Sequence, residues 1–157
     1  MKKTCKFCWA VSLVLAGVLA YGAYTFLIRG DVTHAEDGRT AILLSAGERN
    51  HVLGEMRGLL EAVQSITEGL GANDMELVAS SATAVGMALA GGESPSLIAK
   101  LPLEFKTNGF AAHAAFDSLA ATARDSGDSN KVVQELSEIL GACTACHAGY
   151  RIALEAE

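Results

Sequence analysis

The sequence has little proline and no segment in which apolar and polar residues alternate. Only two prolines occur among 157 residues, Pro95 and Pro102, and both fall in one connection. The alternation typical of half-buried strands is missing. Apolar residues instead recur at intervals of three and four, which is the spacing of amphipathic helices. We therefore expect an all-α fold with one long connection.

Charge is missing from a long N-terminal run. The 22 residues from Phe7 to Ile28 carry no charged side chain, and Lys2, Lys3 and Lys6 precede them. At about 1.5 Å per residue the run is long enough to cross a hydrocarbon core of about 30 Å. It is longer than the apolar part of a signal peptide, and no small-residue cleavage site follows it.

We therefore predict that residues 1–28 form an uncleaved anchor, with a cleaved signal sequence as the alternative. Basic residues before a span keep the N-terminus in the cytoplasm. The expected location is a bacterial inner membrane, crossed once, with the C-terminal domain in the periplasm.

Basic side chains are scarce after this run. Residues 29–157 hold nine basic and eighteen acidic side chains and therefore carry a net charge of −9. The three lysines of the first 28 residues bring the net charge of the whole chain to −6. An acidic domain of this kind argues against nucleic acid as a partner. It is compatible with a basic protein partner.

Helical patterns begin after residues 29–44, which are polar and irregular and which we interpret as a linker. Ser45 and Glu48 have the S-x-x-E form of a capping box. Glycine and serine breaks then separate four helices, expected over about 45–70, 73–91, 103–124 and 128–154. Two short links and one longer one predict an antiparallel four-helix bundle over residues 45–157, a fold that holds cofactors in its core.

Cysteine is also scarce, but two of the four cysteines belong to a specific motif. Cys143, Cys146 and His147 form C-x-x-C-H, the pattern of covalent c-type haem attachment. On a helix the three side chains project from neighbouring positions, so that two thioether links and an imidazole can hold one haem c. His147 is then the proximal iron ligand. A thioredoxin-type dithiol, a zinc site and a disulfide are the alternatives. Because the motif occurs once, a multi-haem array is excluded.

The motif and its place on the last of four helices resemble the cytochrome c-prime family, the class II c-type cytochromes. The resemblance covers roughly residues 45–154, and Cys143–Arg151 fits the C-x-x-C-H-x-x-Y-R form common in that family. It implies a four-helix bundle with a haem in its core and with Arg151 beside the haem. The ordinary alternative for Arg151 is a helix-terminal arginine that complements the helix dipole.

No methionine or histidine follows His147, so a second axial ligand must come from upstream. In an antiparallel bundle, the rise per residue places Met56, Met87 and His113 at heights near that of His147. The resemblance favours Met56, because helix one builds the distal face in that family and low-spin relatives place a coordinating methionine there. The alternative is that Met56 is an ordinary core methionine, which would leave the iron five-coordinate. His51 is expected to face away from the core.

These features predict a membrane-tethered periplasmic cytochrome that carries single electrons and is not an enzyme. Its expected partners are a redox protein, the membrane and, by analogy with related bundles, a second copy of itself. The alternative is a gas-binding protein whose five-coordinate haem takes nitric oxide or carbon monoxide. A third class is a structural or sensory module in which the haem only stabilises the fold.

Overall fold

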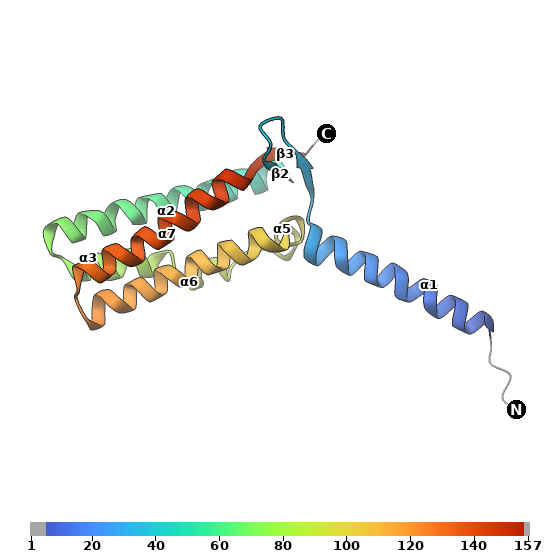
Figure 1. Cartoon of the computed structure of the whole chain (residues 1–157), viewed down its shortest axis with the longest axis horizontal. Helices are drawn as coiled ribbons and strands as arrows, with labels where there is room; N and C mark the ends of the chain where they lie inside the picture. The colour runs from blue at the N-terminus through green and yellow to red at the C-terminus, as the bar shows by residue number, and fades with distance from the viewer. Residues whose placement is uncertain (1–5, 156–157) are drawn as a thin grey trace, which may run out of the picture.

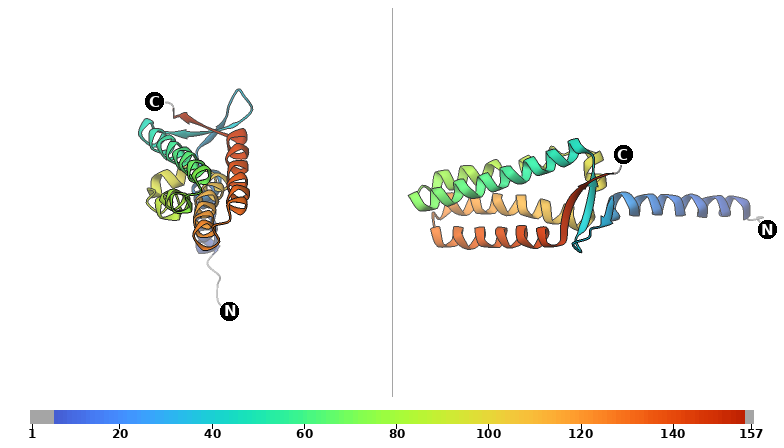
Figure 2. Two further views of the ribbon diagram at one scale, coloured as in Figure 1. Left: turned by 90° about the vertical axis from the view of Figure 1, so that its left-hand side faces the viewer. Right: turned by 90° about the horizontal axis from the view of Figure 1, so that it is seen from above.

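The computed structural model describes residues 6–155, which are mostly helical. An apolar helix projects from one end of an elongated helical body, and a small sheet lies where the two meet (Figure 1). The second and third views of the same ribbon show the same arrangement (Figure 2). Lys2 and Lys3, on which the expected membrane orientation partly depends, lie outside the described residues.

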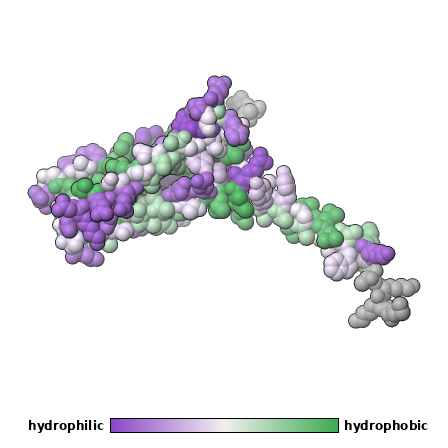
Figure 3. Space-filling model, in the orientation of Figure 1, coloured by the Kyte–Doolittle hydropathy of each residue, from purple (hydrophilic) through white to green (hydrophobic). Residues whose placement is uncertain are grey.

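The projecting element is helix α1 (Lys6–Ala23), continued by the π-helical turn η1 (Tyr24–Arg29). Together they form a 24-residue helix with no buried residue, and its most apolar 18 residues have a mean hydropathy of 2.0. Green and pale colours follow its length in Figure 3, between purple residues at its ends. The expected apolar N-terminal helix is confirmed, and by length and composition it can cross a membrane. Its orientation in a membrane stays a prediction.

Hydrogen bonds to backbone carbonyls and a close approach of the backbone attach the end of this helix to the body. Lys106 Nζ donates to the carbonyl of Leu27 at 3.1 Å, and a positive charge is favourable at a helix C-terminus. Gly30 follows with φ 67°, and a Cβ there would lie 2.5 Å from the carbonyl oxygen of Lys100. The same oxygen accepts the N–H of Asp31 at 2.7 Å. Only glycine fits this close approach.

The body begins with α2 (Ala46–Ala72), which starts where the capping box predicts. Ser45 Oγ accepts the N–H of Glu48, and the Glu48 side chain accepts the N–H of Ser45. The helix ends at Asn73, whose left-handed conformation is a common helix stop. The remaining helices are α3 (Met75–Ala84), α4 (Met87–Ala90), α5 (Pro95–Lys100), α6 (Leu103–Asp125) and α7 (Ser129–Gly149).

The helix expected over 73–91 is divided into α3 and α4. A Cβ at Gly86 would collide with the carboxylate of Asp117 on α6, and this carboxylate accepts the N–H of Met87 at 2.9 Å. The Asp117 carboxylate therefore occupies the space that a side chain at position 86 would need, and it caps the N-terminus of α4. The expectation of one helix was wrong because its interruption depends on a residue 30 positions away.

Two apolar clusters form the core. The larger one joins α2, α3, α6 and α7, and Cys143 packs against its edge. Its fully buried large side chains are Ile66, Val78, Phe116, Leu119 and Val132. The smaller cluster joins the start of α2, α5 and the sheet through Ile42, Leu44, Val52, Leu97 and Leu101.

The sheet contradicts the expectation of a purely helical fold. Its strands are β1 (Val32–His34), β2 (Thr40–Leu44) and β3 (Tyr150–Leu154), in the order β1-β2-β3. β1 pairs antiparallel with β2, and β2 pairs parallel with β3. Residues expected as a linker therefore form a hairpin, and α7 ends at Gly149 instead of reaching Leu154.

These strands have no local signal. In β2, Ala41, Ile42 and Leu44 are all buried, so apolar and polar residues do not alternate. β3 directly follows α7, and no proline at the junction signals the end of the helix. The parallel partner of β3 lies near the other end of the chain. Parallel pairing between distant segments leaves no turn motif in the sequence to predict it.

The stability of the fold in acid is expected to depend on Glu48, which lies on α2 and joins this helix to Ser45 and to α5. Its carboxylate accepts from Lys100 Nζ on α5 at 2.7 Å as well as from the N–H of Ser45. The Lys100 hydrogen bond, followed by those from Ser45, lowers the pKa of Glu48 from 4.5 to about 2.

A depressed carboxyl pKa stabilises the fold above its unfolded value and loses that contribution as the pH falls toward the folded value. We expect Glu48→Gln to lower the thermal midpoint at neutral pH and to reduce the loss of stability between about pH 5 and about pH 2. Circular dichroism melts at several pH values measure both effects. Glu61→Gln, at an exposed position of the same helix, is the control. Parallel pH profiles for wild type and Glu48→Gln would contradict the expectation.

Candidate functional site

The C-x-x-C-H motif occupies the last two turns of α7, as the sequence predicts. His147 is exposed, and its Nδ1 lies 2.7 Å from the carbonyl oxygen of Cys143. Because a carbonyl only accepts, Nδ1 is the donor in this contact, and Nε2 is the other ring nitrogen. A hydrogen bond of this kind is how proteins orient a metal-binding imidazole. The local geometry therefore leaves Nε2 of His147 as a ligand atom.

The two thiols of the motif are half-buried. Burial raises the pKa of Cys143. Burial is also the main cause of the raised pKa of Cys146, to which Cys143 and Glu104 contribute less. Catalytic dithiols have a lowered thiol pKa, because the thiolate is the reactive form. The environment of Cys143 and Cys146 therefore does not favour a thioredoxin-type function.

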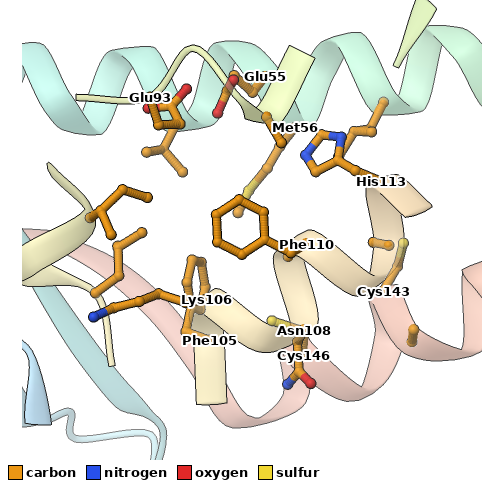
Figure 4. A pocket seen from close by; sticks show the side chains of 18 of the residues that line it. Glu55, Met56, Glu93, Phe105, Lys106, Asn108, Phe110, His113, Cys143 and Cys146 are labelled. Carbon is orange, nitrogen blue, oxygen red and sulfur yellow. The ribbon is translucent and has the colours of Figure 1, made fainter. Parts of the chain in front are cut away.

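Both thiols and His147 border a cavity between α2, α5, α6 and α7. Its empty volume is about 970 Å³ when the part open to solvent is included. The walls are mostly apolar and include Val52, Leu59, Leu97, Phe105 and Phe110. In Figure 4 the ring of Phe110 lies near the middle of this space.

Met56 reaches the same cavity from the opposite wall. It is half-buried on α2, and its thioether points inward above Phe110 (Figure 4). Its side chain also packs on the smaller core cluster. The structure thus brings Met56 and the motif to one space, although the two segments lie far apart in the sequence.

The two other candidate ligands differ in placement. His113 on α6 is 9% exposed, borders the cavity, and uses Nδ1 to donate to the carbonyl of Val85 at 2.7 Å. Its Nε2 is therefore the nitrogen left for a ligand. Met87 is 39% exposed on α4 and is not among the residues that border the cavity. Geometry keeps Met56 and His113 as candidates and removes Met87.

Arg151 does not lie where a continued helix would place it. It belongs to β3, is exposed, and directs Nη1 toward Asp37 Oδ2 at 3.4 Å. It is also absent from the cavity wall. The cause is the end of α7 at Gly149, which turns the following residues into the sheet. A cation that does border the cavity is Lys106, whose pKa is lowered by burial.

Arg39 supports the motif and was not a candidate from the sequence. Its Nη1 donates to the carbonyl of His147 at 3.3 Å and to that of Tyr150 at 3.5 Å. The carbonyls at a helix C-terminus have no partner within the helix, so Arg39 satisfies groups that would otherwise need water. Asp37 holds the guanidinium at 2.7 Å. No local pattern links Arg39 to the motif, because the β1–β2 hairpin brings it there.

Tyr150 fixes the junction between α7 and β3. Its hydroxyl donates to Glu104 on α6 at 2.8 Å, and its ring meets Phe105 edge to face with centroids 5.5 Å apart. Burial and the Glu104 hydrogen bond raise the pKa of Tyr150 to about 12. The neutral phenol thus joins the end of the motif helix to a wall of the cavity.

Comparison with known proteins gave no match to any family model, curated protein or solved structure. The resemblance to the cytochromes c-prime therefore rests on the residues of this chain.

Proposed function

We propose that this chain is a membrane-tethered c-type cytochrome that carries single electrons through one covalently bound haem and transforms no substrate. One observation carries the proposal. Cys143, Cys146 and His147 border, from a single helix, an apolar cavity into which Met56 points from the opposite wall.

The donor set suits a haem c. Cys143 and Cys146 offer neutral thiols for two thioether bonds, and His147 offers Nε2 with its ring held by a backbone carbonyl. A bound haem c would supply a one-electron Fe(III)/Fe(II) couple. Met56 would offer its thioether sulfur to the iron, and the apolar walls would exclude water from the couple. Lys106 and Asn108 are polar residues of α6 that border the cavity, and Lys106 Nζ is bonded to the carbonyl of Leu27.

The proposed architecture is an antiparallel four-helix bundle of α2, α3, α6 and α7, related to that of the cytochromes c-prime. The large apolar cluster shared by these four helices supports it. In this proposal the β1–β2 hairpin and β3 are additions at the end of the bundle that carries the motif. They place Arg39 against the last turn of α7.

The proposed location is a bacterial inner membrane, with α1 and η1 as a single-pass anchor and the bundle in the periplasm. The length and hydropathy of Lys6–Arg29 support an anchor, and the lysines before it favour a cytoplasmic N-terminus. Lys106 bonds the end of the anchor and also borders the cavity. The cavity would therefore lie near the membrane surface, within reach of a redox partner held there.

The proposal is tested on the full chain produced in a bacterium that attaches haem c and purified in detergent. We expect haem that survives denaturation, a low-spin absorption spectrum, and a reversible one-electron potentiometric titration. We also expect the haem protein in the membrane fraction of the cells. A chain without covalent haem would refute the proposal, and a high-spin spectrum with tight carbon monoxide binding would replace electron transfer by gas binding.

A further inference from the structure

A second cluster of ligand-type side chains lies at the rim of the cavity, away from the motif. It consists of His51 and Glu55 on α2 and Glu93 between α4 and α5. One ligand atom from each side chain lies within 4.8 Å of the others. His51 and Glu55 are four residues apart, so both project from the same face of the helix. In Figure 4 the carboxylates of Glu55 and Glu93 lie close to each other.

The carboxylates of this cluster lack a permanent counter-charge. His51 Nε2 lies 2.9 Å and 3.2 Å from the two oxygens of Glu93. Within residues 6–155, no lysine or arginine forms an ion pair with Glu55 or Glu93. Burial, followed by the contact with Glu93, raises the pKa of Glu55. A divalent cation would neutralise both carboxylates.

We propose that His51, Glu55 and Glu93 form a divalent-cation site of the zinc type. An imidazole nitrogen with two carboxylate oxygens is a donor set of Zn²⁺, whereas Ca²⁺ and Mg²⁺ prefer oxygen alone. Tetrahedral zinc with bonds of about 2.0–2.1 Å holds its ligand atoms about 3.4 Å apart. The ligand atoms lie within 4.8 Å of one another, so the three side chains need to come closer together to bind an ion. The His51 side chain is 54% exposed and that of Glu93 13% exposed, so an ion can enter from solvent into a partly enclosed position.

The site would have a structural consequence beside the cavity. Glu55 directly precedes Met56, and Glu93 lies in the segment that connects α4 to α5. A cation bound to both would tie this segment to α2 at the wall that carries Met56. The proposal uses no property of the haem and is independent of the function proposed above.

The test uses the full chain in detergent and Zn²⁺ as the probe. Isothermal titration calorimetry should show zinc binding to the wild type that His51→Ala and Glu93→Gln each weaken by more than about tenfold. The matched controls are His34→Ala on β1 and Glu61→Gln on α2, both at exposed positions outside the cluster. All variants keep Cys143 and Cys146, so zinc held by the thiols affects every measurement equally.

A second measurement covers the case in which a variant folds poorly. Zinc should raise the thermal midpoint of the wild type and of both controls by more than it raises the midpoints of His51→Ala and Glu93→Gln. Equal zinc affinity in cluster variants and controls would overturn the proposal. Binding of Ca²⁺ in preference to Zn²⁺ would overturn it as well, because that selectivity excludes a histidine ligand.

Discussion

Replacing Cys143 and Cys146 together by serine is expected to abolish covalent haem attachment. Cys143 and Cys146 would hold the haem through thioether bonds, which a serine hydroxyl cannot form. The two sulfurs face one cavity from a single helix. Removing both therefore leaves His147 as the only group of α7 that can hold the cofactor. The expected effect is complete loss of the covalent product.

Haem staining of denaturing gels measures this loss, and the mass of the intact chain confirms it. Thr144→Ala is the matched control, because Thr144 lies between the two cysteines but bonds only the carbonyl of Gly141 in its own helix. The control should stain like wild type. Staining of the double serine variant at the wild-type level would show that the motif is not the attachment site.

Replacing Met56 by leucine is expected to convert a low-spin haem into a high-spin one. Leucine nearly conserves the volume of methionine, so the packing against the smaller core cluster should survive. The substitution removes the thioether sulfur that points into the cavity. Loss of a methionine ligand also lowers the reduction potential and opens a position to carbon monoxide.

Absorption spectra of the oxidised and reduced protein, with and without carbon monoxide, measure this change. Met87→Leu is the control, since Met87 is exposed on α4 and does not border the cavity. It should leave the spectrum unchanged. A low-spin spectrum that persists in Met56→Leu would instead assign the axial position to His113, the other candidate at the cavity. Its loss in the double variant Met56→Leu with His113→Leu would then establish that assignment.

Placement of the candidate residues could be predicted only where it follows from local geometry. The relation of Cys143, Cys146 and His147 is set by three- and four-residue spacing on a helix, and the structure has that helix. The family resemblance implied that Arg151 lies beside the haem. In the structure Arg151 does not border the cavity, because α7 ends at Gly149 and β3 begins. The choice between Met56 and Met87 depended on which helix walls the cavity, which spacing along the chain does not specify.

The sheet shows the same limit for the fold. The capping box at Ser45 and Glu48 and the helix breaks are short-range features, so α2, α6 and α7 begin where the sequence predicts. β2 and β3 have neither alternation nor a connecting turn, and they pair across nearly the whole chain. As a result Arg39, which lies in residues expected to form a linker, reaches the carbonyl of His147.

The sequence by itself determined the apolar N-terminal helix, the mostly helical body and the side chains of the C-x-x-C-H motif. Each depends on composition or on contacts within one helical turn or two. Only the tertiary structure decided the three-stranded sheet, the division of α3 from α4, the cavity shared by Met56 and His147, and the cluster of His51, Glu55 and Glu93. These depend on which distant segments pack together, because burial and strand pairing join residues that have no fixed spacing along the chain.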